Sequence, residues 1–303
     1  MQHLDLTALR YFGEAAACGS IRLAADRLHV TPSAVSRQIA KLEHRLGTPL
    51  FERRASGVIL TAAGALLSEE VEKIDRNLAR VRDRIADLEG LRRGEVGMYC
   101  MEGAVDTWLP EVIGEFHRRY PAISFKTYVA STDASMQALQ EDRCDWALTF
   151  RTIDRDDIQV VRRQSEPLIG LVAPSHPLAQ QAELSFDAML DYPLVMPGPS
   201  FGTRQIVDRC ARSAKRGYTC IVDTNSIAMT KSLVRKGVGL TFLPAFSAQH
   251  DLSIGSLRRI RVLDMPALAA DIQLCARRDR THTAAARRLG ELLTEQFPLL
   301  FTH

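Results

Sequence analysis

A short run of hydroxyl and basic side chains, spaced to share one face of a helix, is the part of this sequence best suited to contact a polyanion. A helix is predicted from Pro32 to Leu46, because Thr31 is a good N-cap, proline suits the first helical position and Gly47 ends the run. Hydroxyl and guanidinium groups on a face of small residues can read base edges and phosphates in a DNA major groove. This face is formed by Ser33, Arg37, Ala40 and His44, with Ser36 and Lys41 beside it, opposite an apolar face of Val35, Ile39, Leu42 and Leu46.

The segments around this helix predict a small domain that positions it. Apolar residues at helical spacing predict one helix within residues 4–19 and a second one within residues 20–28. A short turn then leads into the polar helix, and two helices joined in this way form a helix-turn-helix motif. Residues 49–60 predict a two-stranded wing whose tip carries Arg53 and Arg54.

The excess of positive charge is concentrated in the same region. The 303-residue chain carries 39 Lys and Arg against 36 Asp and Glu, a net charge of +3. Seven basic and three acidic side chains lie between Ser20 and Arg54, an excess of four, so the rest of the chain sums to −1. A local basic field in a nearly neutral protein steers a domain toward phosphates. A generic three-helix unit with a solvated charged surface is the alternative, but the polar face, the local charge and the basic wing together favour DNA binding.

A long amphipathic helix follows the wing and predicts a second copy of the chain as its partner. Thr61 suits the N-cap, and apolar residues then recur at alternating intervals of four and three, an a/d seam of about three heptads. Packing on the chain's own second domain is the alternative to a dimer, and a two-fold dimer would read two half-sites. The predicted dimerisation residues are Leu67, Val71, Ile74, Leu78, Val81, Ile85 and Leu88.

Composition and missing motifs exclude other classes of protein. With 46% hydrophobic and 25% charged residues, the chain is typical of a globular protein of about two domains. It has no apolar run of the ~18 residues that a membrane span needs, and no signal peptide is recognisable. The six cysteines lack zinc-ligand spacing, and GxSxG, P-loop and HExxH motifs are absent. We therefore expect a cytoplasmic protein with reduced thiols, no metal or cofactor, no membrane contact and no enzymatic activity.

Beyond Gly94, strand-like and helix-like segments alternate, which predicts an α/β region with a parallel sheet. In the first half, strands are expected at 95–101, 124–129 and 146–150, and helices at 108–120 and 133–141. A second alternating run lies between residues 168 and 242. A strand at 271–276 and a helix at 281–296 return to the first half.

The N-terminal motifs together resemble the signature of LysR-type transcriptional regulators. The matching segments are Leu9–Phe12, Gly19-Ser20, Ala24–Ile39, Leu42-Glu43, Leu46-Gly47, Leu50–Arg53 and Leu60–Gly64. Segments Asp145–Leu148, Pro174–Leu178 and Val234–Pro244 are similar to parts of the effector domain of the same family, so the resemblance covers essentially the whole chain.

The resemblance implies three parts. They are a winged helix-turn-helix DNA-binding domain at 1–61, a linker and dimerisation helix at 62–90, and an effector-binding domain at 91–303. The last resembles a periplasmic-binding-protein-like clamp of two α/β subdomains, at about 91–165 with 267–303 and about 166–266.

The resemblance also implies DNA contacts and partners. The residues expected to meet base edges and phosphates are Pro32, Ser33, Ser36 and Arg37. Gln38 and Lys41 are expected to face the DNA backbone, and Arg53 and Arg54 are expected to lie at the wing. Expected partners are double-stranded DNA with interrupted palindromic promoter sites, a small-molecule effector, further copies of the chain as homodimer or homotetramer, and RNA polymerase if the protein is an activator.

Ligands in such folds bind at the carboxyl ends of strands, near helix N-termini that attract anions. The residues expected there are Met101, Glu102, Gly103, Ser131, Thr132, Thr149, Phe150, Ser200, Phe201, Gly202, Thr203 and Arg204. By family analogy, the hydroxyl residues among them would bind a carboxylate and Arg204 would supply charge, although the same hydroxyls could be ordinary helix caps. Glu102 is unusual in an anion site, and would bind a ligand amine or face solvent.

Cys210 and Cys220 raise a thiol-redox alternative, because the peroxide-sensing branch of the family uses cysteines in this region. In that branch the reactive cysteine precedes the helix, near the position of Gly202 here. A small-molecule effector is therefore favoured over a redox-responsive or ligand-independent regulator.

Overall fold

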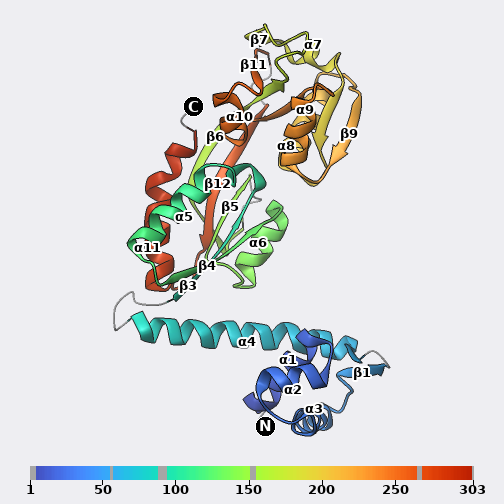
Figure 1. Ribbon diagram of the computed structural model, residues 1–303, viewed down its shortest axis with the longest axis vertical. Coiled ribbons are helices and arrows are strands. Elements are labelled where there is room, and N and C mark those ends of the chain that lie inside the picture. Colours follow the sequence, from blue (N-terminus) through green and yellow to red (C-terminus); the bar gives the residue numbers. More distant parts are fainter. Residues whose placement is uncertain (1–4, 55–56, 88–93, 151–154, 265–267, 302–303) are drawn as a thin grey trace. The chain divides into compact units, whose positions relative to one another are not determined.

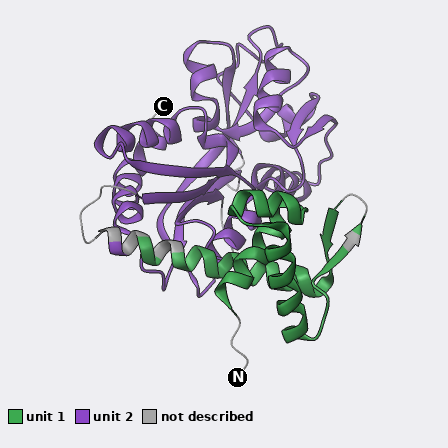
Figure 2. Cartoon of the chain, turned by 60° about the horizontal axis from the view of Figure 1, so that its bottom comes forward, with its two compact units in different colours: residues 1–82 green, residues 83–303 purple. Residues whose placement is uncertain are grey.

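The computed structural model describes residues 5–54, 57–87, 94–150, 155–264 and 268–301. The chain forms two compact units, residues 1–82 and 83–303, which Figure 2 shows in separate colours. Within the described ranges, no helix is both long and apolar enough to cross a membrane.

The N-terminal unit contains three helices, a two-stranded wing and most of a long fourth helix (Figure 1). Its elements are α1 (Leu6–Cys18), α2 (Ile21–Leu28), α3 (Pro32–Leu46), β1 (Phe51–Arg54), β2 (Gly57–Leu60) and α4 (Ala62–Asp87). The side chains of Ser20 and Thr31 cap α2 and α3, because they accept hydrogen bonds from the first turn of each helix. β1 and β2 pair antiparallel and form the wing.

The apolar face of α3 packs into a small core, as its periodicity predicts. Val35, Ile39 and Leu42 are buried against α1 and α2. The pair Ala24 and Ala25 is fully buried, and these small side chains let α2 and α3 approach closely. Leu46, predicted on the same apolar face, is instead 40% exposed because the helix ends there.

The predicted seam of α4 divides into two parts with different surroundings. Leu67, Val71 and Ile74 pack on the core formed by α1, α3 and the wing, and Val71 is only 3% exposed. Val71 is therefore used within its own chain, whereas Leu67 and Ile74 are only partly buried, and their contact with a second copy stays a prediction. Further along, the exposed fractions of Leu78, Val81 and Ile85 are 44%, 51% and 60%. Leu88 lies outside the described residues.

The C-terminal unit has two lobes that share long strands. Lobe I contains β3 (Gly94–Cys100), η1 (Glu102–Ala104), α5 (Trp108–Arg119), β4 (Ile123–Val129), α6 (Thr132–Gln140), β5 (Trp146–Phe150), the first part of β6 (Ile158–Val172), β12 (Ala269–Arg277), α11 (Ala284–Gln296) and η3 (Phe297–Phe301). Helices α5 and α11 cover one face of its sheet and α6 covers the other (Figure 1).

Lobe II contains the end of β6 and the elements between it and β12. These are β7 (Glu183–Leu184), α7 (Phe186–Leu190), β8 (Leu194–Pro197), α8 (Gly202–Ser213), β9 (Cys220–Thr224), α9 (Ile227–Arg235), β10 (Thr241–Pro244), η2 (Ala245–Ala248), α10 (Gln249–Ser253) and β11 (Arg258–Val262). β8 and β9 form a separate parallel pair.

The main sheet is mixed, whereas alternation in the sequence predicts a parallel one. Its order is β4-β3-β5-β12-β6-β11-β7, with β10 also paired to β6. β3 is parallel to β4 and β5, as predicted. β12 departs from the prediction because it returns from lobe II and runs antiparallel between β5 and β6. β10 and β11 are likewise antiparallel to β6.

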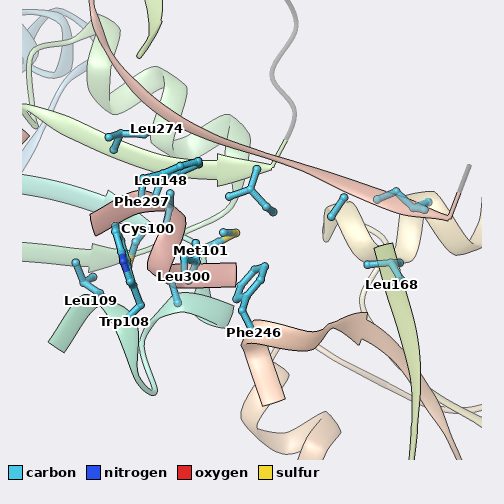
Figure 3. Packing of buried hydrophobic residues seen from close by; sticks show 14 of the residues in the cluster. Cys100, Met101, Trp108, Leu109, Leu148, Leu168, Phe246, Leu274, Phe297 and Leu300 are labelled. Carbon is cyan, nitrogen blue, oxygen red and sulfur yellow. The ribbon is translucent and has the colours of Figure 1, made fainter. Parts of the chain in front are cut away.

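One hydrophobic core extends through both lobes. It joins Cys100, Trp108 and Leu148 of lobe I to Phe246 of lobe II (Figure 3). The rings of Phe246 and Phe301 meet edge-on with 5.9 Å between their centroids. Since the same cluster fills both lobes, moving one lobe against the other exposes apolar surface, which is unfavourable.

Gly290 marks the closest approach of α11 to the sheet. An added Cβ would lie 1.9 Å from Cζ2 of Trp146, whose ring is fixed by a 2.8 Å hydrogen bond from its Nε1 to the Ala286 carbonyl oxygen. We expect Gly290→Ala to lower the free energy of unfolding by about 1–3 kcal/mol, despite the better helix propensity of alanine. Thermal unfolding followed by circular dichroism measures this. Gly217→Ala is the control, because a Cβ there meets nothing within 4 Å; an unchanged midpoint for Gly290→Ala would contradict the packing.

Candidate DNA-binding face and ligand cavity

The residues predicted to contact DNA lie on the side of α3 that faces away from the core. Pro32, Ser33, Arg37 and Lys41 are exposed, and Ser36 and Gln38 are half-buried at the edges of this face. The first turn of α3 has no acidic side chain, so the positive end of the helix adds to the field of Arg37 and Lys41. This is the arrangement that a major-groove contact requires, and the individual base and phosphate contacts stay a prediction.

The one acidic residue of α3 is used for structure. One carboxylate oxygen of Glu43, Oε1, accepts hydrogen bonds from the backbone amides of Leu50 (2.8 Å) and Phe51 (3.3 Å). Glu43 therefore holds the start of the wing against α3. Its negative charge is compensated there by two amides, which limits its effect on the basic face.

The wing is tied to the helical part of the unit. The Val58 amide donates to the Gly19 carbonyl oxygen at 2.9 Å, which fixes β2 against the end of α1. Arg54 is exposed and pairs with Glu52 at 3.6 Å, a surface contact that contributes little to stability. The side chain of Arg53 lies outside the described residues.

A cavity of about 280 Å³ lies between the lobes of the C-terminal unit. Eleven of the twelve residues predicted for effector binding line it, and Arg204 is the exception. The sequence analysis missed eight lining residues, namely Val129, Ala130, Asn225, Ile227, Leu243, Pro244, Phe246 and Ser247. Four of these, 243, 244, 246 and 247, directly follow the second alternating run, which ends at residue 242. The expectation that ligands bind at the carboxyl ends of strands would have found them if it had been applied there.

Three helices begin at the cavity, α6, α8 and α9. α6 and α9 are capped by Ser131 and Ser226, whose hydroxyls accept hydrogen bonds from first-turn amides. α8 begins without a side-chain cap on Phe201, so its first amides are open to a ligand. Thr203 in this turn is 1% exposed, and its hydroxyl has no hydrogen-bond partner among the described residues.

Two glycines bring the lobes close together at the cavity. A Cβ on Gly202 would lie 3.0–3.3 Å from atoms of the Phe150 side chain, across the cavity wall in lobe I. A Cβ on Gly103 would lie 3.1 Å from Cβ of Ser247 in lobe II. Side chains at these positions would push the lobes apart, so the glycines set how narrow the cavity is.

Glu102 makes contacts within the chain that the sequence did not predict, and its binding of a ligand amine stays a prediction. Its Oε1 accepts hydrogen bonds from the Ser226 hydroxyl (2.9 Å) and the Ala228 amide (3.0 Å). The carboxylate is thus bound at the start of α9, where the helix dipole favours a negative charge. It is also the only charged side chain among the described residues that line the cavity.

Arg204 is predicted to supply positive charge to a ligand, but it does not line the cavity. Its guanidinium donates to Asp208 at 3.0 and 3.2 Å and pairs with Asp223 at 3.4 Å. It also lies 5.7 Å from the centre of the Tyr218 ring. Arg204 lies in the first turn of α8, near the cavity, but its charge is neutralised by these two carboxylates. Direct ligand binding by Arg204 is therefore not supported.

The thiols of the C-terminal unit are mostly protonated. Burial raises the pKa of Cys100 and Cys144 to about 12 and that of Cys275 to about 11, and it raises the pKa of Cys210 as well. A raised pKa suppresses the thiolate, which is the reactive form. Among the described residues, no group of three or more His, Cys, Asp and Glu side chains is placed to hold a metal ion.

Comparison with known proteins identifies the family. The model of the LysR substrate binding domain matches residues 89–298, and that of the bacterial regulatory helix-turn-helix protein, lysR family, matches residues 6–65. The chain belongs to the LysR family of transcriptional regulators. LysR-type regulators combine these two domains, so DNA binding and an effector-binding domain follow from membership.

The similarity extends over nearly the whole chain. The RuBisCO operon transcriptional regulator of Allochromatium vinosum is 28% identical over 268 residues, covering 87% of this chain and 86% of that protein. The structure of full-length CbnR with its target DNA has a TM-score of 0.73 at 19% identity, covering 96% of this LysR-type chain and 99% of CbnR. A full-length OxyR variant from Pseudomonas aeruginosa has a TM-score of 0.70 at 22% identity, covering 99% and 96%.

Arg37→Ala is expected to weaken binding to the DNA upstream of the protein's own gene and to reduce discrimination against unrelated DNA. Loss of a base contact costs about 1–3 kcal/mol, or roughly 5- to 150-fold in affinity. Fluorescence anisotropy at fixed salt measures both. Arg118→Ala, an exposed arginine on α5 of the other unit, is the matched control. Normal affinity and specificity of Arg37→Ala would show that α3 is not the recognition helix.

Proposed function

We propose that this LysR-type regulator binds interrupted palindromic promoter sites as a dimer, and that its cavity senses a small effector with a carboxylate group. The observation that carries the effector proposal is the start of α8, where an uncapped helix turn and the buried Thr203 hydroxyl both lack partners. An unsatisfied buried hydroxyl costs about 1–3 kcal/mol. A ligand oxygen that accepts from it would recover this energy.

Backbone groups rather than charged side chains favour the anion. Each helix N-terminus carries a charge of roughly +0.5, and α6 and α8 both begin at the cavity. A single carboxylate between them matches this field, as helix N-termini commonly bind such groups. Glu102 already occupies the start of α9, and its charge disfavours a second acidic group on the ligand.

The rest of the cavity suits an apolar ligand body. Its walls include the apolar residues Met101, Val129, Phe150, Phe201, Ile227, Leu243, Pro244 and Phe246. A volume of about 280 Å³ limits the ligand to a small metabolite. We therefore favour a monocarboxylate with an aromatic or branched aliphatic body.

The exposed half of the α4 seam supports the dimer. Leu78, Val81 and Ile85 are large apolar side chains on one stripe of a helix, and all are exposed. Pairing with the same helix of a second copy would bury them and place two recognition helices for two half-sites. Assembly into a tetramer, contact with RNA polymerase in the case of an activator, and location in the cytoplasm with the DNA belong to the same proposal.

An effector can act only if it binds two arrangements of the oligomer with different affinity. The two arrangements would space the DNA-binding units differently, so that ligand binding and DNA binding are linked through one free energy. This linkage does not require any change in the residues that contact DNA.

A redox-responsive regulator is the alternative, since OxyR is among the proteins of similar fold. A reactive thiol needs a lowered pKa, whereas burial raises the pKa of Cys210. Cys220 is partly exposed and accepts a long hydrogen bond from Arg204, at 3.9 Å. Cys210 therefore lacks an activated thiol, so the small-molecule effector is favoured.

Thr203→Val is expected to weaken ligand binding without destabilising the protein. The valine has the same shape but lacks the unsatisfied hydroxyl, so the ligand-free variant should be at least as stable as the wild type. Screening the full chain with carboxylic acids by thermal shift should yield a hit, because a ligand that binds only the folded state raises stability. The hit should bind the variant about 10- to 100-fold more weakly, as loss of a hydrogen bond to a charged group implies.

Thr127→Val, on the exposed strand β4, is the matched control and should bind the hit normally. A screen without any carboxylate hit, or a hit that binds Thr203→Val equally well, would overturn the proposed effector class. Promoter binding that responds to hydrogen peroxide and loses this response in Cys210→Ser would instead support the redox alternative.

A further inference from the structure

A short segment of lobe I reaches helix α9 of lobe II at two points. Glu102 accepts hydrogen bonds from the Ser226 hydroxyl and the Ala228 amide, at 2.9 and 3.0 Å. Four residues later in the chain, Asp106 forms an ion pair with Lys231, about one turn further along α9. We call these five residues the interlobe clasp.

Lys231, in the second contact of the clasp, has partners in both lobes. It is 4% exposed, and its ammonium group also donates to the Ser247 carbonyl oxygen (2.8 Å) and pairs with Asp251 (3.1 Å). A buried ammonium group is tolerated only when it is paired and hydrogen-bonded. Separation of the lobes would remove Asp106 and leave the two partners in lobe II in place. The clasp can therefore open between the lobes without unfolding lobe II.

Asp251 anchors this group of charges within lobe II. It is 2% exposed and accepts hydrogen bonds from Arg235 (2.5 Å) and the Ser256 hydroxyl (3.1 Å). Burial raises the pKa of Asp251, but these donors and Lys231 outweigh it and hold the pKa below its ordinary value. Lys231 is consequently fixed in position with its ammonium group toward lobe I.

The clasp is part of the cavity wall. Glu102 lines the cavity, and so do Ser247, which binds Lys231, and Ile227, the first residue of α9. The opposite part of the wall is the start of α8, whose Gly202 lies against Phe150 of lobe I. The separation between the lobes is thus set on one side by the clasp and on the other by van der Waals contact.

We propose that Glu102 and Asp106 are positioning residues, which hold the lobes together beside the cavity. Helix α9 is bound from lobe I at its first turn and at the next, so these contacts limit how far the lobes can separate. Glu102 belongs to both the cavity and the clasp, and a ligand beside it alters its hydrogen bonds to α9. This inference rests on the proposed effector cavity for its functional meaning, but the contacts themselves involve only residues of the chain.

Hydrogen–deuterium exchange of the full, ligand-free chain tests the clasp. In Glu102→Ala and in Asp106→Ala we expect faster exchange in α9 and also in α8, which carries no residue of the clasp. The opening equilibrium should shift about tenfold for each variant, since each loses contacts to a charged group. Glu102→Gln should stay close to the wild type, because its amide oxygen can still accept from Ser226 and Ala228.

Glu291→Ala removes a surface carboxylate of lobe I that pairs with Arg288, and serves as the control. Faster exchange confined to α9 would overturn the proposal, since Glu102 would then only cap that helix. Unchanged exchange in both variants would overturn it as well. Asp106 is exposed, so Asp106→Ala keeps the test valid if Glu102→Ala does not fold. No ligand is added, so this result is independent of the carboxylate screen.

Discussion

The pairing of β6 with its neighbours is the constraint on which the C-terminal unit depends. β6 is one strand of 15 residues, whose first part pairs with β12 in lobe I and whose last part pairs with β10 and β11 in lobe II. A shift of register by one residue would turn its buried side chains outward in both lobes, so the ladder fixes how the lobes are joined. The cavity lies between the two lobes that β6 joins. Its walls can therefore move only at the weaker contacts, which are the close approaches of Gly103 and Gly202 and the interlobe clasp.

The hydrogen-bond donors of the cavity are mainly groups that the fold places there, rather than charged side chains. Amides at helix starts and the hydroxyl of Thr203 offer donors that are already desolvated, so they need little reorganisation to bind an oxygen. Arg204 is neutralised by Asp208 and Asp223, and Glu102 adds a negative charge. Both features point to a ligand that carries little charge and is recognised by shape.

Patterns with strong local causes could be predicted from the sequence. The period of Val35, Ile39 and Leu42 placed the apolar face of α3 correctly, and strand ends located eleven of the cavity residues. Features that depend on tertiary context could not. The heptad pattern of α4 does not reveal that Val71 packs against Gly13 and its neighbours in the same chain. The first part of β6, with Arg162, Arg163 and Gln164, lacks the apolar run of a buried strand and is stabilised by its long ladder to β12.

Occupancy of the cavity is expected to change how this LysR-type regulator binds DNA. The most direct measurement is a footprint of the DNA upstream of its own gene, recorded with and without the carboxylate that gives the largest thermal shift. Two protected half-sites are predicted, with a ligand-dependent change in their spacing or affinity that Thr203→Val lacks. A footprint that is the same with and without ligand, or the same change in Thr203→Val, would contradict the account.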